Sequence, residues 1–212
     1  MNLPSPYLER QALIQHFEHL GLFTPTVQDA IDLAERVHRG QRRDDGLPYP
    51  EEHIFPVGAG VGSYTVAKGW TPADASQGVI IGLLHDTIED SPTLRPADLE
   101  RQFGQEIAAA VVTLSKPDSW YSGGWDSDER EYVVGILKAP LVVRVVKMFD
   151  RMNNLACIHK SHPSKRHRYL DETARYYVAL AHSTDEEFEG AIRQYLAGKP
   201  RVLYGLWAEW LP

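Results

Sequence analysis

Four residues that could do chemistry end an apolar stretch of the chain, from Gln77 to Asp90: His85, Asp86, Glu89 and Asp90. The apolar residues before them are typical of a helix that is buried on most sides. Side chains three and four positions apart share one face of a helix, so the three acids would cluster with the histidine beside them. Acids at the C-terminal end of a helix face its negative pole, which costs a few tenths to about 1 kcal/mol per charge. A bound cation would remove that cost.

A second apolar stretch, predicted to be a helix from Pro140 to Ile158, carries another polar set. Its members are Lys147, Asp150, Arg151 and Asn154, which follow the three-and-four spacing of one helix face. Polar side chains on an otherwise apolar helix need partners, because their burial without a hydrogen bond is costly. The two stretches could supply each other's partners.

Together with His53 at a predicted helix start, these stretches offer two imidazoles and two carboxylates, from His85, Asp86 and Asp150. A mixed nitrogen and oxygen set of this kind suits Mn²⁺, Fe²⁺ or Zn²⁺. The single cysteine, Cys157, excludes a disulfide within the chain and a site built from thiolates. Spacing alone leaves open whether His85-Asp86 binds a metal or merely ends a core helix.

The elements that must position these residues are predicted to be helices throughout. Hydrophobic periodicity with capping and stop signals places helices at 7–19, 26–40, 51–68, 71–90, 96–103, 105–114, 126–138, 140–158, 163–181, 184–197 and 202–211. The 140–158 stretch is rich in β-branched residues, but it is much longer than the usual strand of about 5–6 residues. With no repeat and no composition boundary, we predict one all-α domain over residues 1–212.

Two irregular segments interrupt the helices. The segment from Arg42 to Pro50 contains one glycine and two further turn-forming prolines, and loops of this kind often carry function. The segment from Lys116 to Ser127 has Gly123-Gly124 between two tryptophans, and the sequence leaves open whether it is a lid or a loop folded over the core.

Composition narrows the classes of partner. A net charge of −7 argues against a general nucleic-acid binder, which needs clustered Lys and Arg, but allows an anionic small molecule at a local cation or metal. The longest apolar run, within Val79 to Leu84, is far shorter than the roughly 20 residues that span a bilayer. Since the N-terminal residues also lack the pattern of a secretory signal, we expect a cytoplasmic location.

Three sequence blocks, taken in order with His53, resemble a known family. They are G-Q-R-R-D-D-G-L-P-Y from Gly40, L-L-H-D-T-I-E-D from Leu83 and V-K-M-F-D-R-M-N-N-L from Val146. This order resembles the HD-domain hydrolases of guanosine tetraphosphate, the RelA/SpoT hydrolase family. The resemblance covers roughly residues 27–181. Since no segment resembles a synthetase domain, the resemblance is to a stand-alone small alarmone hydrolase.

The resemblance implies a Mn²⁺-dependent enzyme that removes pyrophosphate from the 3′ position of guanosine tetra- or pentaphosphate. The positions that match the family's metal ligands are His53, His85, Asp86 and Asp150. Glu89 and Asp90 match the acidic pair that positions and deprotonates the attacking water. The positions that match substrate-binding residues are Arg43, Lys147, Arg151 and Asn154.

The chain departs from the family pattern on the substrate side. The family usually reads P-Y-x-x-H-P, whereas this chain reads P-Y-P-E-E-H-I-F-P, with an extra residue after Tyr49. Asp44 stands where a basic or small polar residue is common, and Cys157 where a hydroxyl residue often helps to hold the nucleoside. An HD-domain phosphohydrolase of another nucleotide is therefore an alternative.

A third hypothesis is a non-catalytic helical module that senses a nucleotide and keeps the metal for structure. The Glu89-Asp90 pair argues against it, because a structural ion needs ligands but no adjacent base. The sequence does not indicate the oligomeric state.

Overall fold

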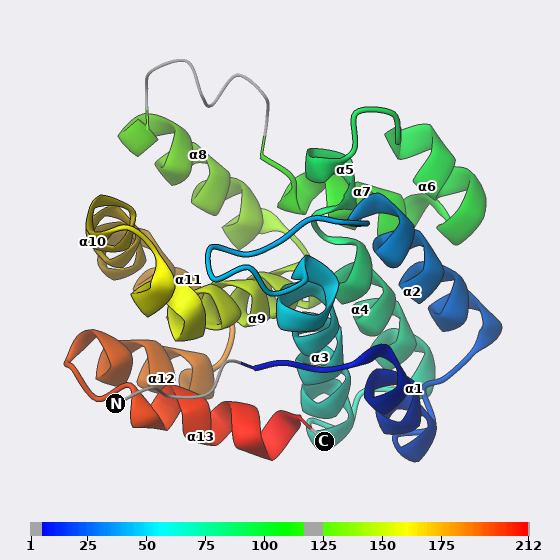
Figure 1. Cartoon of the computed structure of the whole chain (residues 1–212), viewed down its shortest axis with the longest axis horizontal. Helices are drawn as coiled ribbons and strands as arrows, with labels where there is room; N and C mark the ends of the chain where they lie inside the picture. Colours follow the sequence, from blue (N-terminus) through cyan, green and yellow to red (C-terminus); the bar gives the residue numbers. More distant parts are fainter. Residues whose placement is uncertain (1–5, 117–124, 212) are drawn as a thin grey trace.

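Two apolar helices, α3 (Phe55–Ala67) and α4 (Pro72–Leu84), lie side by side at the centre of the molecule (Figure 1). The computed structural model describes residues 6–116 and 125–211. α1 (Arg10–His19) and α2 (Pro25–Val37) flank this pair, and α9 (Leu141–Cys157) packs against both helices. α9 brings the second predicted polar face to the centre of the fold.

The other elements surround this centre. They are α5 (Thr87–Asp90), α6 (Pro96–Phe103), α7 (Gln105–Leu114), α8 (Trp125–Lys138), α10 (Pro163–Glu172), α11 (Val178–His182), α12 (Glu186–Leu196) and α13 (Arg201–Trp210). The described residues contain no β-strand, so the all-α prediction is confirmed. One apolar core includes residues from α1 through α13. This continuity supports a single domain, which remains a prediction.

The helix boundaries follow local signals closely. α6 and α7 begin and end where the sequence predicts, because the positive-φ Gly104 separates them. α2 (Pro25–Val37) begins one residue earlier than the predicted 26–40: Thr24 is the N-cap and accepts a hydrogen bond from Val27 N at 3.2 Å. Pro25 occupies the first helical position, where its missing N–H costs nothing.

The helix predicted to run unbroken to Asp90 is interrupted at His85 and Asp86. α4 ends at Leu84 and α5 begins at Thr87. Two side chains form hydrogen bonds with backbone carbonyls here: Thr87 Oγ1 donates to Leu84 O at 2.6 Å, and His85 Nδ1 lies 2.8 Å from Gly82 O. Side chains that bind nearby carbonyls compete with the helical ladder, and these two contacts accompany the break.

The helix predicted from residue 51 begins with a π turn, η1 (Pro50–Ile54), which runs into α3. A π turn holds one more residue than an α turn. It therefore accommodates the extra residue by which this chain departs from the P-Y-x-x-H-P pattern. A second π turn, η4 (Thr173–Tyr177), separates α10 from α11, where one helix was predicted, and η3 (Ile158–Lys160) is a short 3₁₀ turn after α9.

Of the predicted loop or lid from Lys116 to Ser127, positions 117–124 lie outside the described residues. In the part of the chain that the structure covers, every helix is too short or too polar to cross a bilayer.

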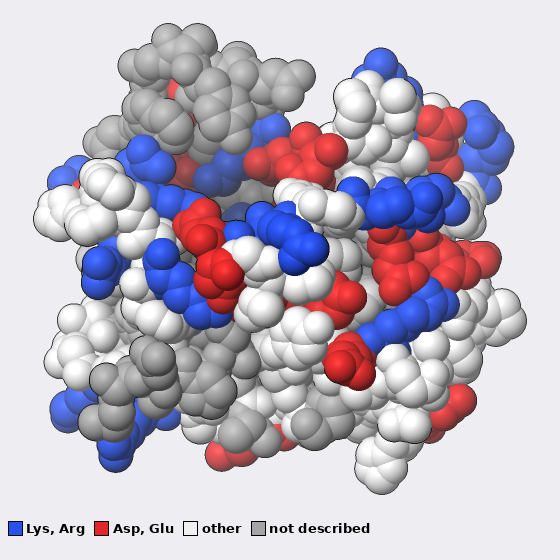
Figure 2. All heavy atoms as spheres, viewed as in Figure 1, with Lys and Arg blue, Asp and Glu red and all other residues white. Residues whose placement is uncertain are grey.

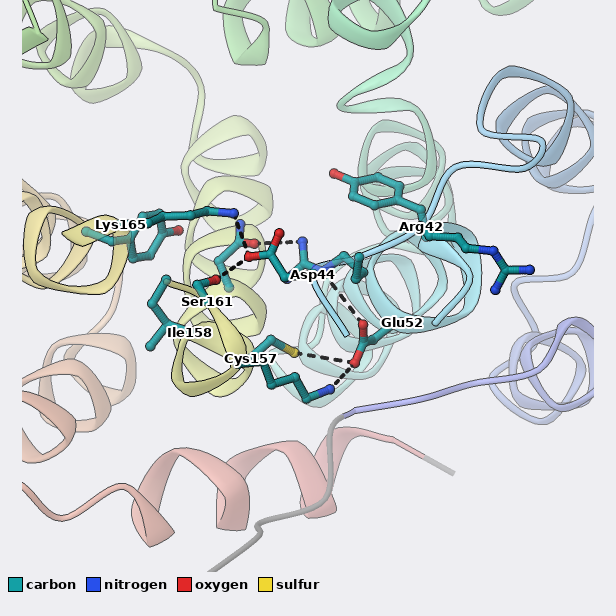
Figure 3. Close-up of a pocket in the computed structure, with 12 residues that line it drawn as sticks. Arg42, Asp44, Glu52, Cys157, Ile158, Ser161 and Lys165 are labelled. Atoms are coloured by element: carbon teal, nitrogen blue, oxygen red, sulfur yellow. Dashed lines mark hydrogen bonds and ion pairs between the residues drawn. The ribbon is translucent and has the colours of Figure 1, made fainter. Parts of the chain in front are cut away.

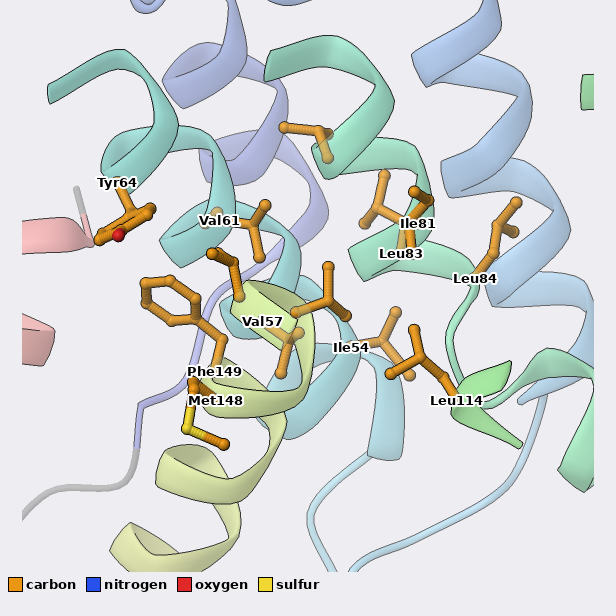
Figure 4. Packing of buried hydrophobic residues seen from close by; sticks show 14 of the residues in the cluster. Ile54, Val57, Val61, Tyr64, Ile81, Leu83, Leu84, Leu114, Met148 and Phe149 are labelled. Carbon is orange, nitrogen blue, oxygen red and sulfur yellow. The ribbon is translucent and has the colours of Figure 1, made fainter. Parts of the chain in front are cut away.

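Glycines allow α3 to approach its neighbours closely. Figure 4 shows Val57 and Val61 of α3 between Leu83 of α4 and Phe149 of α9. A Cβ atom at Gly60 would lie 2.6 Å from Phe149 Cδ1, far inside van der Waals contact. The Phe149 ring is itself held edge-on by the rings of an aromatic cluster, among them Tyr64, Phe188, Trp207 and Trp210.

Replacing Gly60 by alanine should therefore force α3 and α9 apart. We expect Gly60→Ala to lower the free energy of unfolding by about 1–3 kcal/mol, the usual cost of overpacking a core. Gly135→Ala on the exposed side of α8, where nothing lies within 4 Å of the added Cβ, is the matched control. The control should be neutral or stabilising by up to about 1 kcal/mol. Urea unfolding of both variants measures the difference, and equal stabilities would contradict the packing argument.

Candidate metal and catalytic site

Two buried imidazoles face each other where η1 meets the turn between α4 and α5. His53 Nε2 and His85 Nε2 lie 3.2 Å apart, and both side chains are about 1% exposed. The opposite nitrogen of each ring contacts an oxygen: His53 Nδ1 lies 2.7 Å from Asn153 Oδ1, and His85 Nδ1 lies 2.8 Å from Gly82 O. These contacts place a proton on each Nδ1, so both Nε2 lone pairs point into the same space.

Two carboxylates approach the same space. Asp86 Oδ2 lies 3.3 Å from His53 Nε2 and 3.2 Å from His85 Nε2. Asp150 Oδ1, from α9, lies 3.5 Å and 4.0 Å from the same two nitrogens. The structure thus brings together the four residues predicted to be metal ligands, from three elements far apart in the sequence.

Neighbouring side chains hold both carboxylates in place. The Tyr49 hydroxyl donates to Asp86 Oδ2 at 2.6 Å. Lys147 Nζ donates to Asp150 Oδ2 at 2.7 Å, and Asn154 Nδ2 donates to Asp150 Oδ1 at 2.6 Å. Such supporting contacts orient metal ligands and are typical of functional metal sites.

The donor set fits one divalent cation. Ligand atoms of His53, His85 and Asp86 all lie within 4.8 Å of one another, with Asp150 beside them. Two lone pairs and two carboxylate oxygens that converge in a buried space require a positive charge between them. Nitrogen and oxygen donors in equal number suit a first-row transition ion.

The ionisation of these groups reflects the same crowding. Burial disfavours the charged form of His85, but the Asp86 and Asp150 carboxylates outweigh it and raise the pKa of His85 to about 9. Burial also disfavours the charged form of Asp150 and so acts to raise its pKa. Lys147 and the two histidines outweigh this effect and lower the pKa of Asp150 to about 2. Without an ion, a proton supplies the positive charge that the cluster needs.

The two acids of the predicted catalytic pair lie in different surroundings. Glu89 lines the hollow of about 290 Å³ that His53, Asp86 and Asp150 also line, and its Oε2 accepts a hydrogen bond from Lys116 N at 3.0 Å. Burial, and then the charge of Asp86, raises the pKa of the Glu89 carboxyl. Asp90 instead accepts from Gln41 Nε2 at 2.9 Å and is not among the residues that line this hollow.

The residues predicted to bind substrate lie around the same hollow or at its edge. Asn154, Lys147 and Arg151 line it, and Arg43 joins them through a hydrogen bond from its NH1 to Asn154 Oδ1 at 3.0 Å. Lys116, Lys165 and Arg168 add further cations to its wall. On the face of the molecule shown in Figure 2, basic and acidic side chains are intermixed across the middle.

Arg151 is more deeply held than the sequence suggests. Its side chain is 2% exposed, and its guanidinium lies between the Tyr169 and Tyr177 rings at 3.5 and 3.8 Å from their centroids. Arg151 Nε also donates to Thr173 Oγ1 at 2.9 Å. These contacts already fix the position of the guanidinium within the protein. Contact between Arg151 and a substrate remains a prediction.

The sequence interpretation missed two supporting residues. Asn153 contacts His53 and also donates from Nδ2 to Glu52 O at 3.1 Å, so it ties α9 to η1. Tyr49 holds Asp86. Asn153 could have been found from its position next to Asn154. Adjacent side chains on a helix are about 100° apart, so Asn153 points away from Asp150 and toward η1.

The chain belongs to the HD-domain family, because its residues 30–185 match the model of the HD domain. Among its relatives, the GTP pyrophosphokinase of Streptomyces coelicolor is 33% identical over 158 residues, which cover 74% of this chain and 17% of the relative. The guanosine-3′,5′-bis(diphosphate) 3′-pyrophosphohydrolase of Haemophilus influenzae is 31% identical over 153 residues, which cover 71% of this chain and 21% of the relative. The resemblance seen in the motifs is thus confirmed.

The chain spans about a fifth of the length of these relatives. A solved structure of a metazoan ortholog of SpoT, described as hydrolysing ppGpp and playing a role in starvation responses, matches with a TM-score of 0.66. The match covers 84% of this chain and 97% of the other at 19% sequence identity, and it shows that the two share a fold.

Asp86 offers the cleanest test of the metal site. Asp86→Asn keeps the size of the side chain and an acceptor for Tyr49, whereas changing Asp150 would leave the buried ammonium of Lys147 without its carboxylate. We expect Asp86→Asn to weaken Mn²⁺ binding by more than about 100-fold, because even outer contacts of a metal site are worth 10–100-fold.

Calorimetric titration with Mn²⁺ measures this affinity, and circular dichroism confirms the fold. Asp171→Asn, an exposed acid on α10, is the matched control and should bind Mn²⁺ as the unchanged protein does. Equal affinity of the two variants would remove Asp86 from the ligand set.

Proposed function

We propose that this protein is a Mn²⁺-dependent hydrolase that releases pyrophosphate from the 3′ position of guanosine tetra- or pentaphosphate. The observation that carries the proposal is the convergence of His53, His85, Asp86 and Asp150 in a hollow that Glu89 also lines. Relatives named as 3′-pyrophosphohydrolases of guanosine-3′,5′-bis(diphosphate) from three organisms support the substrate and the reaction. A cytoplasmic location would suit such a nucleotide.

A divalent ion held by the four ligands would lower the pKa of water and offset the charge of a phosphate ester. Glu89 is the residue we assign as general base, because it lies beside the ligands without being one. Its raised pKa makes it a better proton acceptor than an ordinary carboxylate, and the Lys116 N–H fixes its orientation.

The cations of the hollow explain how an acidic chain could hold a polyanion. Lys147 is paired with Asp150 and Lys165 with Asp44, and both Lys165 and Arg168 extend from α10 as exposed side chains at the rim. Local cations are sufficient for phosphate groups, since a charge within a few ångströms outweighs distant surface charges screened by salt.

Replacing Glu89 by glutamine separates chemistry from binding. The amide is isosteric and Glu89 is not a proposed ligand, so Glu89→Gln should keep the fold and the metal. Turnover should fall by about 100-fold or more, since a general base contributes 10²- to 10⁴-fold. The measurement is pyrophosphate release from guanosine tetraphosphate with Mn²⁺. Glu18→Gln, an exposed acid on α1, is the control and should retain full activity.

The outcomes separate the competing functions. Equal release by Glu89→Gln and the unchanged protein would assign the base to Asp90. No release by the unchanged protein, with another nucleotide cleaved, would favour the alternative HD-domain phosphohydrolase. Binding of nucleotide without cleavage of any would favour the sensor.

A further inference from the structure

A second cavity, of about 220 Å³, opens beside the metal hollow (Figure 3). Four residues line both spaces: Tyr49, Asn154, Lys165 and Tyr169. A nucleotide whose reacting phosphate lies at the metal ligands can therefore extend into this cavity. Its volume is below the roughly 300–1,000 Å³ of pockets that enclose whole drug-sized ligands, so it suits one part of a nucleotide.

The charges of the cavity wall indicate which part. This wall holds four cations, Arg42, Arg43, Lys160 and Lys165, and two carboxylates, Asp44 and Glu52. Lys165 is paired with Asp44 at 2.8 Å, and Lys160 and Arg43 are paired with Glu52, so three of these cations already have a carboxylate partner. A phosphate group entering here would meet both carboxylates. Flat groups that stack on a base are present instead: the Tyr49 ring, with the Arg43 guanidinium 5.6 Å from its centroid. The wall therefore suits a nucleobase better than a phosphate.

Glu52 has an unusual environment in this wall. The residue is 0% exposed, and its Oε1 accepts a hydrogen bond from Lys160 Nζ. Its Oε2 has no hydrogen-bond partner among the described residues, and Arg43 Nε lies 3.8 Å away. A buried carboxylate oxygen without a donor is costly, so a ligand that supplies donors would gain from meeting it.

The π turn η1 places Glu52 beside this cavity. Glu52 lies in the π turn η1, one position before His53, in the part of the chain that departs from the P-Y-x-x-H-P pattern. The π turn presents His53 to the metal cluster and Glu52 to the neighbouring cavity.

We propose that Glu52 reads the base of the substrate by accepting hydrogen bonds from its N–H edge, and so selects guanine over adenine. This inference rests on the proposed function. Guanine presents two adjacent donors, N1–H and the N2 amino group, which match a carboxylate. Adenine presents the bare N1 lone pair at the same edge, which the Glu52 carboxylate repels. Inosine keeps N1–H but lacks the amino group, so it should rank between the two.

The test measures base preference by binding, so that it does not depend on turnover. The probes are guanosine, inosine and adenosine 5′-diphosphates, titrated calorimetrically into Mn²⁺-loaded protein. We expect affinity in the order guanosine, inosine, adenosine, with guanosine about 10- to 100-fold tighter than adenosine, as for one bidentate base contact. Equal affinities in the unchanged protein would overturn the proposal even if no variant folds.

Two variants assign the preference to one side chain. Glu52→Gln should reduce the guanosine preference to about 3-fold or less, because an amide offers a donor as well as an acceptor. Glu51→Gln, its neighbour outside the cavity wall, should keep the full preference. An equal loss of affinity for all three nucleotides in Glu52→Gln would show a purely structural role and overturn the proposal.

Turnover distinguishes this inference from the function on which it rests. Pyrophosphate release is measured in parallel from guanosine 3′,5′-bis(diphosphate) and its adenosine counterpart. No release from either would sink the proposed reaction, whereas a Glu52-dependent preference for guanosine diphosphate would still uphold the assignment of Glu52.

Discussion

Two buried imidazoles whose Nε2 atoms lie 3.2 Å apart, with two carboxylates beside them, need a metal cation or a proton between them. The rest of the structure can be understood as the means of keeping them there. Asn153 and the Gly82 carbonyl fix the protons on the far side of each ring, and Asp86 and Asp150 add negative charge. The cluster is consequently arranged to hold a cation between the two imidazoles and the two carboxylates.

This arrangement depends on how closely α9 packs against α3 and against the π turn η1 that leads into α3. Glycines in α3 let α9 approach until Phe149 contacts the α3 backbone region, and the same approach brings Asp150 and Asn153 to His53. The apolar core and the polar cluster are therefore connected: Phe149, which packs against α3, and Asn153, which contacts His53, lie four residues apart on one face of α9. A shift of about 1 Å between these helices would move a ligand out of reach, because productive geometry tolerates only about 0.5 Å.

The sequence predicts much of this because helical periodicity determines which side chains share a face. It predicts the all-α class, most helices to within a few residues, and the faces that carry His85, Asp86 and Asp150. It does not predict the break at His85, because the competition of His85 and Thr87 for backbone carbonyls depends on the local fold. Nor can it separate Glu89 from Asp90. Both follow Asp86 at helical spacing, and only the tertiary contacts with Lys116 and Gln41 distinguish them.

The π turn η1 has a consequence for how such a chain can diverge. Inserting one residue into an α-helix turns every later side chain by about 100° relative to the earlier ones, which would carry an entire ligand face away from its partners. A π turn confines that rotation to a single turn. Residues before His53 could thus lengthen and change while the histidine kept its orientation. The loop before His53 and the helix after it are in this sense separately variable, so the wall of the neighbouring cavity can change without moving the cluster of His53, His85, Asp86 and Asp150.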